Sequence, residues 1–518
     1  MGRNRFLIFL FAVLAWTTPS QAENILRLAL PELPMMLDPH RAVRVAEYIL
    51  TRELFIGLVT YDANGNLVPG LAESWAVSGD GRTYTFTLRP DLEWSDGKRI
   101  DATTIVKSFE RALDPSLFAP FVAQLLIIKN ADLFRLGTLP SGEVMGVIAR
   151  DRRTIEFQLI APSQRFLNVL AQPLAAPVPL HRITELREAW ASPFIVTGNG
   201  PFMTSPRGDR YALKRNPRFF DSGNVAAERV DIDVLAVASE ARSAAHDDKV
   251  DVALGFMAEP QSARVTSRSS ATVDTVQAYS LLVNSSKPPF DKREVRHALG
   301  MAIDRDGLIK SLRITDSHPA YNVVPAPTYS PYRAPYARLD PAARRIVAEA
   351  LLLDTDVGQV AAIRFAHPIG KVHAAIAESI AKIWKELGFT VNLIARSDAD
   401  HEQAVLHGDF DVALAPDWRA GNGVEPYLFS FSQSAGPWNA ARYRELAFDE
   451  RLVAADIETN SEYYLGQLRD AEGVLIEDQA LWPVLFYPTP VIGHGALPGL
   501  NANAAGIHPL RFIVPPNR

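Results

Sequence analysis

The side chains best suited to metal or acid–base chemistry are a group of histidines in the second half of the chain. His401 and Glu402 are adjacent, as in a zinc-binding helix, but the next histidine is His407. Such a helix needs two histidines four residues apart, so a histidine six positions away does not complete the site. His367 and His373 likewise have no third ligand beside them. We therefore expect His401 and His407 to be surface residues, and we predict no metal site.

The motifs of common enzyme classes are absent from the sequence. There is no G-x-S-x-G nucleophile elbow and no G-x-x-x-x-G-K-[ST] phosphate loop. The chain has 0 Cys, which excludes thiolate catalysis, thiolate metal sites and disulfides. The sequence therefore predicts a protein that is not an enzyme and needs no cofactor, with any ATP hydrolysis carried out by a partner.

The stretch best suited to binding a ligand is PDWRAGNGVEP, residues 416–426. It follows a region of alternating strands and helices, which indicates a parallel sheet whose ligands bind at the carboxyl ends of the strands. The predicted elements are strands at 361–366, 390–394 and 411–415 and a helix at 373–387, followed by Gly388 as its C′ residue. Trp418 is the strongest single contact, because Gly421 and Gly423 leave the backbone room for a ligand.

A second stretch, residues 284–312, begins this half of the protein. Residues 275–284 predict a buried strand, and Pro288-Pro289 forces a turn after it. Asp291 is the predicted N-cap of the next helix, with Glu294 completing an acidic capping box. Asp304 is expected to cap a second, shorter helix. We interpret this pattern as the entry into the second half of a two-lobed protein.

The first half of the chain predicts hairpins with a few helices. Asn64-Gly65 is the strongest short hairpin signal. Residues 83–88 alternate between apolar residues and threonine, which predicts a half-buried strand paired with residues 73–77. Helices are expected at 45–55 and at 101–113, the second capped by its aspartate.

Composition sets further limits. A chain of 518 residues, 47% of them hydrophobic, has enough core for two or three domains. Its 53 Lys+Arg and 59 Asp+Glu give a net charge of −6 without a basic stripe. We therefore expect no nucleic-acid partner.

The first 22 residues have the pattern of a secretory signal. Arg3 and Arg5 precede an apolar run at residues 6–16, and Ser20-Gln21-Ala22 is a small-residue cleavage site. The apolar run is too short to span a bilayer, which favours cleavage over an uncleaved anchor. We expect a soluble, exported mature chain that starts near Glu23 and carries a net charge of −8, two less than the full chain.

Seven motifs are spread over the mature chain: ESWAVSGDGRTYTFTLRPDLEWSDGK (73–98), SFERALDP (108–115), GNGPF (198–202), LKRNPRFF (213–220), the block from Pro288 to Arg305, GDFDV (408–412) and Phe448-Asp449. In order and spacing they resemble the oligopeptide- and dipeptide-binding family, the extracellular solute-binding proteins (family 5) of ABC importers.

The resemblance implies an α/β fold, namely the two-lobed periplasmic binding protein fold (class II, large three-domain variety) with hinge strands between lobes. Lobe I would comprise residues 23–55, 178–275 and 488–518, lobe II residues 56–177 and lobe III residues 276–487. The strands crossing between lobes would lie near Ala278 and Tyr487, and solute would be enclosed between lobes I and III. A pair of such connections favours hinge bending over twisting.

The family's site motif is changed here at one informative position. In peptide-binding members a Trp-x-Ala-Asp-Tyr motif supplies an aspartate that meets the α-ammonium of the peptide. Trp418 and Ala420 match, but Gly421 replaces the aspartate, Asn422 replaces the tyrosine, and the loop is one residue longer before Glu425. Three alternatives follow: another acid (Asp417 or Glu425) takes over, the solute is a blocked or modified peptide, or the solute is not a peptide.

Position in the family pattern gives further candidates, each with a simpler alternative. Arg44 and Val45 lie where the family's first lobe offers backbone to the ligand, although Arg44 also fits an ordinary solvated residue before a helix. Asn284 suits either a solute contact or the capping of a turn. Trp438 suits either a wall of the site or plain core. The predicted ligand-binding residues are Trp418, Arg419, Gly421, Asn422, Glu425, Arg44, Val45, Asn284 and Trp438.

The resemblance implies a monomeric periplasmic receptor that passes a peptide or peptide-like solute to ABC permease subunits coupled to an ATPase. The family also imports sugars, metal chelates, haem and opines, so the same role for a non-peptide solute stays open. A secreted enzyme or a chaperone is the remaining alternative.

Overall fold

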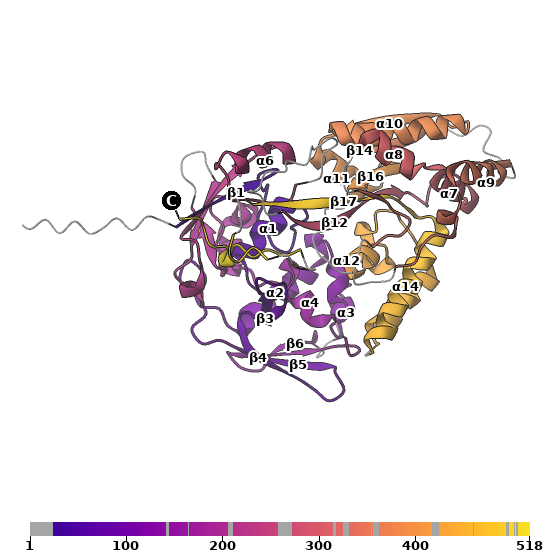
Figure 1. Cartoon of the computed structure of the whole chain (residues 1–518). Helices are drawn as coiled ribbons and strands as arrows, with labels where there is room; N and C mark the ends of the chain where they lie inside the picture. Colours follow the sequence, from indigo (N-terminus) through magenta and orange to yellow (C-terminus); the bar gives the residue numbers. More distant parts are fainter. Residues whose placement is uncertain are drawn as a thin grey trace, which may run out of the picture.

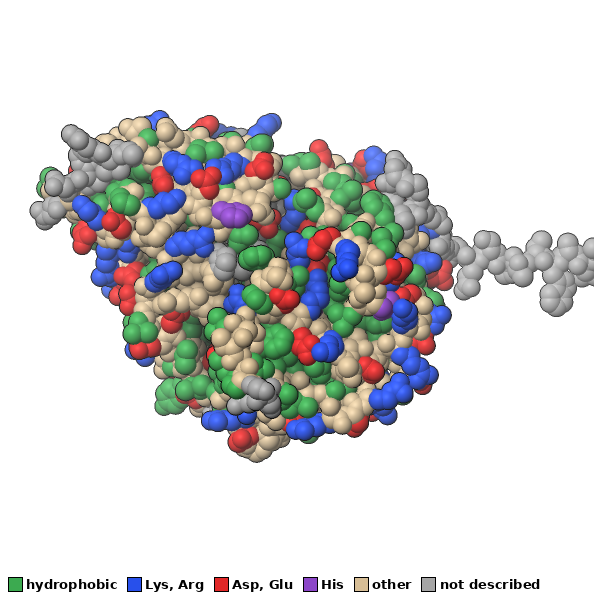
Figure 2. Space-filling model, turned by 180° about the vertical axis from the view of Figure 1, so that it is seen from behind, with side chains coloured by type: hydrophobic (Ala, Val, Ile, Leu, Met, Phe, Trp, Pro, Cys, Tyr) green, Lys and Arg blue, Asp and Glu red, His purple; other side chains and the backbone are tan. Residues whose placement is uncertain are grey.

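The computed structural model describes residues 24–517 except for a set of short segments. The residues left out are 141–143, 164, 206–210, 257–271, 314–316, 325–330, 354, 356–361, 417–423, 459, 494–496, 502 and 504–505. No helix in this described part is long and apolar enough to cross a bilayer. Charged side chains of both signs are intermixed over the face drawn in Figure 2.

One eleven-stranded sheet runs through the whole molecule (Figure 1). In order, its strands are β15 (Val391–Arg396), β14 (Ile363–Pro368), β16 (Val412–Pro416), β12 (Thr272–Val283), β17 (Leu481–Gly493), β11 (Val252–Ala253), β1 (Ile25–Leu30), β10 (Arg229–Val234), β9 (Tyr211–Arg215) and β8 (Phe202–Thr204), with β13 (His318–Pro319) paired to β17. The strands predicted in the second half are therefore β14, β15 and β16, and β14 pairs in parallel with both others.

Two long strands join the two ends of this sheet. β12 and β17 pair antiparallel from Thr272 opposite Ile492 to Leu282 opposite Leu481. The register shifts between Tyr279 and Ser280, which marks a bulge in the middle of the pair. The chain therefore passes between its two halves through paired strands that lie side by side.

The apolar core falls into two bodies on either side of this connection. One cluster takes its described residues from before residue 255 and after 490, whereas two others take theirs only from 278–487. The helices of the first body are α1 (Val45–Leu54), α2 (Ala102–Leu113), α3 (Ala131–Arg135), α4 (Phe166–Leu170), α5 (Leu180–Leu186) and α6 (Ala238–His246). Those of the second body are α7 (Arg293–Ala302), α8 (Arg305–Leu312), α9 (Pro341–Leu353), α10 (Lys371–Glu386), α11 (Asp398–His407), α12 (Val424–Phe429), α13 (Leu446–Asp456) and α14 (Ser461–Asp478).

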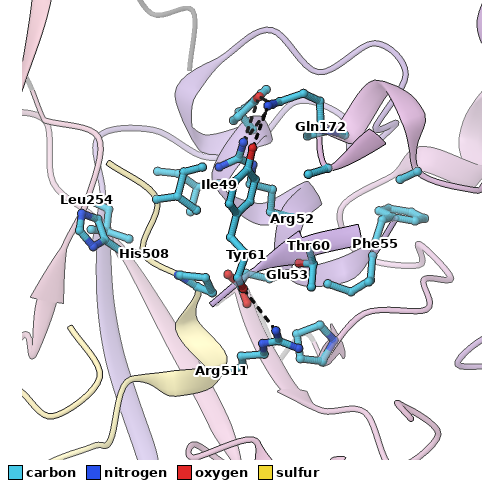
Figure 3. Close-up of a pocket in the computed structure, with 18 of the residues that line it drawn as sticks. Ile49, Arg52, Glu53, Phe55, Thr60, Tyr61, Gln172, Leu254, His508 and Arg511 are labelled. Atoms are coloured by element: carbon cyan, nitrogen blue, oxygen red, sulfur yellow. Dashed lines mark hydrogen bonds between the residues drawn. The ribbon is translucent and has the colours of Figure 1, made fainter. Parts of the chain in front are cut away.

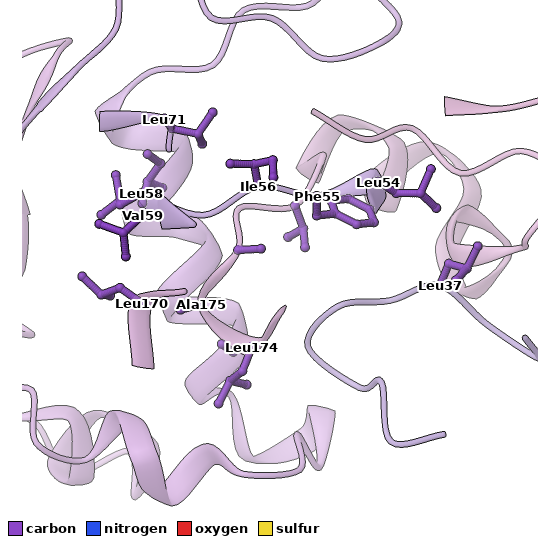
Figure 4. Packing of buried hydrophobic residues seen from close by; sticks show 14 of the residues in the cluster. Leu37, Leu54, Phe55, Ile56, Leu58, Val59, Leu71, Leu170, Leu174 and Ala175 are labelled. Carbon is purple, nitrogen blue, oxygen red and sulfur yellow. The ribbon is translucent and has the colours of Figure 1, made fainter. Parts of the chain in front are cut away.

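The first body also holds two small sheets. They are the hairpin β2 (Val59–Tyr61) and β3 (Leu67–Pro69), and a sheet in the order β4 (Ala72–Val77), β5 (Thr83–Leu88), β7 (Thr154–Gln158) and β6 (Val147–Ala149). Figure 4 shows Leu54 and Phe55 of the α1 region in one cluster with Leu170 and Leu174. Predicted lobes I and II thus share a single apolar core.

One predicted helix start is wrong. α7 begins at Arg293 with Lys292 at its N-cap, and no side chain caps it. Asp291 is still part of the turn that follows Pro288-Pro289, because Nη1 of Arg296 donates to the carbonyl oxygens of Phe290 and Asp291 over 2.8 and 3.3 Å. The second predicted cap is confirmed: the carboxylate of Asp304 accepts the N–H of Gly307 over 3.0 Å.

Candidate functional site

The loop predicted to hold the ligand follows β16, the third strand in the order of the large sheet. β16 ends at Pro416, which pairs with Tyr279 of β12, and α12 begins at Val424. Trp418, Arg419, Gly421 and Asn422 fall between these elements and lie outside the described residues. Glu425 is in α12 and Trp438 ends a 3₁₀ turn (Gln433–Trp438), but the side chains of both also lie outside the described part.

The first body presents the N-terminus of α1. Arg44 precedes the helix and its guanidinium pairs with the carboxylate of Glu32. Val45 follows it and packs against Gly255, where an added Cβ would lie 2.3 Å from Val45 Cγ1. Gly255 has φ +81°, so the close approach needs glycine there. The carboxylate of Glu47 accepts the N–H groups of Val43 and Arg44, each over 3.3 Å, which fixes the start of the helix.

Charged groups of α11 in the second body lie within electrostatic range of the same helix start. Asp398 raises the pKa of Arg44, and Glu47 and Arg44 both act on the pKa of Glu402. Burial, the negative charge of Glu47 and that of Glu32 raise the pKa of Glu402 to about 7, although Arg44 opposes the shift. Burial lowers the pKa of Arg44, but the bond to Glu32 and the nearby carboxylates more than reverse this and raise it.

This contact predicts a pH effect on closure of the two bodies. Glu402 ionises near pH 7 when the bodies are together and near its ordinary 4.5 when it is solvated, so the closed form holds more protons between these values. Closure should therefore weaken as pH rises from about 5 to 7 and change little above that. We expect solute affinity to fall by tenfold or more over this range, because the pKa of Glu402 differs by more than one unit between the two states and one unit corresponds to about 1.4 kcal/mol.

The matched variant is Glu402→Gln, which cannot ionise. Affinities measured by titration calorimetry between pH 5 and 8 should lose this dependence in the variant. Burial of Glu47 raises its pKa too, but Glu47 is common to both proteins and cancels in the comparison. Parallel pH profiles for the two proteins would refute the assignment to Glu402.

A second contact joins the bodies through Arg165, which precedes α4. Its Nε and Nη2 donate to the two carboxylate oxygens of Asp456, the last residue of α13, over 2.5 and 3.0 Å. The guanidinium also lies over the ring of Phe429 in α12, with Cζ 4.3 Å from the centroid. The side chains of Arg165 and Asp456 are 3% and 17% exposed. This is a buried, two-point ion pair between predicted lobes II and III.

Asn284 lies at the end of β12 and its side chain is occupied within the protein. Nδ2 donates to the carbonyl oxygens of Gly408 and Phe410, each over 3.3 Å, and Oδ1 accepts from Ser286 Oγ over 2.7 Å. The residue is 1% exposed. Of the two roles that the sequence left open, this geometry favours the capping of the turn.

The prediction that His401 is a surface residue is wrong, whereas His407 is exposed. His401 lies on the inner face of α11 and is 7% exposed, with Nε2 2.8 Å from the carbonyl oxygen of Leu414. Burial lowers its pKa, and burial lowers that of His373, whose Nδ1 contacts the hydroxyl of Tyr279, to about 4. No cluster of three metal ligands occurs among the described residues.

The sequence did not single out the contacts between the bodies. Arg165 and Asp456 are 291 residues apart, and neither belongs to a motif with a local signal. Glu402 has a local signal only as part of the incomplete zinc-helix pattern with His401. The sequence offers one clue to the contact at α1. The capping pattern at Glu47 fixes where the helix starts and therefore where Arg44 lies.

Comparison with known proteins shows which family the chain resembles. Residues 66–439 match the bacterial extracellular solute-binding proteins, family 5, middle region. The periplasmic oligopeptide-binding protein OppA of Salmonella typhimurium is 29% identical, over 87% of this chain and 85% of that protein. The periplasmic murein peptide-binding protein MppA of Escherichia coli is 28% identical, over 88% and 86%. A probable deoxycholate-binding periplasmic protein of Escherichia coli is 25% identical, over 91% and 89%.

Solved structures have the same fold. The chain superposes on Haemophilus influenzae OppA in complex with the peptide RPPGFSPFR with a TM-score of 0.85 at 23% identity, covering 95% and 99% of the two chains. It superposes on the Escherichia coli murein tripeptide binding protein with a TM-score of 0.84 at 25% identity, covering 95% and 98%, but on an unliganded open form of MppA with only 0.66. The bodies are therefore not arranged as in that open form. The chain belongs to family 5 of the bacterial extracellular solute-binding proteins, which are receptors and not enzymes.

Proposed function

We propose that this chain is a periplasmic receptor that captures a peptide or peptide-like solute and delivers it to the permease of an ABC importer. The solute would be held between lobe I (residues 23–55, 178–275 and 488–518) and lobe III (276–487), with lobe II at 56–177. The observation that carries the proposal is the division of the chain into two bodies that are joined by the paired strands β12 and β17 and held together by Arg165 and Asp456. The names of the relatives, which bind oligopeptides and murein peptides, support the solute class.

The mechanism is capture by closure. Solute would enter while the bodies are apart, lose its water as they close by bending at β12 and β17, and favour the closed form through contacts to both bodies. A ligand shifts such an equilibrium only by its difference in affinity for the two forms. The interactions of Arg165 and Glu402 lie within the protein. Their strength therefore sets how large the difference in solute affinity between the two forms must be to keep the bodies closed.

Closure gives the direct test of this function. Purified mature protein should become more compact in small-angle scattering when its solute is added, and should remain a monomer by light scattering. Mass spectrometry of molecules released from the exported protein should identify the solute. A scattering curve that stays the same with peptide pools and with cell extract would contradict the receptor role.

The second candidate is the same role for a non-peptide solute. It is favoured by Gly421, which stands where peptide-binding members have the carboxylate for the ammonium group. A relative of similar overall length is named a probable deoxycholate-binding protein, so a change of solute class within this fold has a parallel. Arg419, Asn422, Glu425, Trp418 and Trp438 remain the proposed contacts in either case.

Restoring the carboxylate distinguishes the two candidates. Gly421→Asp should tighten binding of free-amine peptides by about tenfold or more, because a charge-assisted hydrogen bond contributes about 1.5–3 kcal/mol. The control is the same peptide with an acetylated amino terminus, whose affinity should not rise. If free-amine and acetylated peptides respond alike to the substitution, the pocket serves another class of solute.

The proposed cellular location follows from the N-terminal pattern and from the periplasmic relatives. We expect residues 1–22 to be removed on export. N-terminal sequencing of the periplasmic fraction should therefore begin near Glu23.

A further inference from the structure

The helix α13 of the second body is apolar on two opposite faces. Its inner face is buried in the core of that body and consists of Phe448, Leu452 and Ala455. Its outer face carries three large apolar side chains that are 67, 61 and 52% exposed, those of Leu446, Val453 and Ile457. A helix with apolar residues on both faces is normally covered on both sides. Within the described residues, nothing covers the outer face of α13.

The three exposed residues form one row, which we call the α13 stripe. They are spaced seven and four residues apart, and this spacing places side chains on the same face of a helix. Ile457 is the C-cap residue and keeps helical dihedral angles, so the row continues to the end of α13. Single exposed apolar residues are common on protein surfaces, whereas a row of them along one helix indicates an interaction site.

The α13 stripe lies beside the contact between the two bodies. Asp456, which accepts both hydrogen bonds from Arg165, immediately precedes Ile457. The stripe also lies far from the strands that join the bodies. α14, which has 18 residues, leads from this end of α13 to β17, a distance of about 27 Å along the helix axis. In Figure 1 α14 extends away from β12 and β17, toward the side on which bodies hinged at these strands would part.

A bound solute does not account for the stripe. The pocket beside α1 (Figure 3) is lined by residues of the first body, among them Val45, which is one of the predicted solute contacts. The stripe belongs to the second body, and it is exposed although the ion pair of Arg165 and Asp456 holds the bodies together. A solute enclosed between lobes I and III would therefore leave the stripe facing solvent.

The surroundings of the stripe are acidic. Residues 445–463 contain one arginine, Arg451, and six acidic residues, namely Glu445, Asp449, Glu450, Asp456, Glu458 and Glu462. The guanidinium of Arg451 lies 3.8 Å from the carboxylate of Asp470 in α14, so it is already paired. Glu450 is exposed and lies within the stripe itself. A complementary surface therefore needs apolar side chains with Lys or Arg around them.

These charges distinguish the possible partners. A second copy of the chain would bring the same carboxylates against the stripe, and the headgroups of anionic lipids would be repelled by them. A protein segment that carries apolar residues flanked by Lys or Arg fits both the stripe and its surroundings. Resting on the proposed receptor function, we propose that the α13 stripe is the surface on which the permease docks, through such a segment of its periplasmic face.

ATP hydrolysis by the importer measures this docking. The probe is the permease with its ATPase in lipid nanodiscs, to which the full mature receptor is added with the solute that it carries after export. Val453→Asp combined with Ile457→Asp should raise the receptor concentration for half-maximal stimulation by about tenfold or more, because a carboxylate cannot replace an apolar anchor in an interface. Glu450→Lys should also weaken the stimulation, because it opposes a basic segment with a like charge.

The matched control is Leu353→Asp. Leu353 ends α9 in the same body and is 85% exposed, but it does not belong to the stripe. This variant should stimulate ATP hydrolysis as wild type does. Solute affinity, measured by calorimetry, should be the same in wild type and in all these variants, because the replaced side chains face solvent.

Crosslinking identifies the partner directly. With p-benzoylphenylalanine in place of Val453, irradiated cells that contain the importer should yield a crosslink to a permease subunit, next to a Lys or Arg in its sequence. The same group in place of Leu353 should yield none. A crosslink from position 453 only to a second copy of the chain, or only to lipid, would overturn the proposal.

The outcomes separate docking from the receptor function. Stimulation that is equal in wild type, in the double variant and in Glu450→Lys would overturn the docking surface alone. A wild-type receptor that fails to stimulate the importer would contradict the receptor function, and the docking surface with it. If the double variant does not fold, Glu450→Lys gives the same test, because this glutamate is exposed and its replacement leaves the core intact.

Discussion

Arg165→Met should open the protein and weaken solute binding by about 30-fold. The ion pair of Arg165 with Asp456 joins predicted lobes II and III, so it exists only while the two bodies are together. Coupling energies of close charge pairs at protein interfaces run from about 1.5 to 7 kcal/mol. We take about 2 kcal/mol, because the same groups regain hydration on opening, and 1.4 kcal/mol corresponds to tenfold.

The geometry of the pair explains why substitution should matter more than at an exposed ion pair. The guanidinium binds both carboxylate oxygens and also stacks on Phe429, so methionine would leave Asp456 largely buried and unpaired in the closed form. Arg150→Met, which removes the exposed ion pair of Arg150 with Glu156, provides the baseline and should leave closure unchanged.

Small-angle scattering and calorimetry would measure the effect. Arg165→Lys keeps the charge but loses the two-point geometry and the stacking, so it should fall between wild type and Arg165→Met. Asp456→Asn completes a double-mutant cycle, in which the two substitutions together should cost less than the sum of their separate effects. An Arg165→Met protein with wild-type compactness and affinity would show that the pair adds nothing to closure.

Local patterns in the sequence predict the elements of the fold well. The carboxylate of Asp101 accepts the N–H of Thr104 over 2.9 Å at the start of α2, as its capping position indicated. Asn64-Gly65 joins β2 and β3, with Gly65 at φ +78°. These signals succeed because turns and caps are decided by neighbours within a few residues. Asp291 does not cap α7, because Arg296 donates to the carbonyl oxygens of Phe290 and Asp291 and so keeps Asp291 in the turn.

Pairings between distant parts of the chain are what the sequence could not supply. The motif order indicated two lobes joined by two strands, yet nothing near Arg165 indicated that it meets Asp456. Arg165 looks like an ordinary surface arginine until the fold places it against Asp456.

Arg305, in the second body, is another buried arginine with a partner far away in the sequence. It is 0% exposed, and among the described residues no carboxylate oxygen lies within 4 Å of its guanidinium. Nε donates to the carbonyl oxygens of Ala320 and Pro483 over 2.9 and 2.8 Å, and Nη1 to those of Gly300 and Ile303, each over 3.2 Å. The group thus ties the end of α7 to β17, one of the two strands between the bodies.

Arg305→Met should therefore be strongly destabilising. It leaves four buried carbonyl oxygens without this donor, and breaking such a buried network costs about 3–5 kcal/mol. For a body of this size that corresponds to a fall of about 10 °C in Tm, which thermal unfolding by circular dichroism would measure. Arg305→Lys should recover only part of the loss, because one ammonium cannot reach four carbonyls fixed around a planar fork. A Tm within about 2 °C of wild type for Arg305→Met would mean that these carbonyls are satisfied without it, since a 1 kcal/mol change already moves Tm by that much.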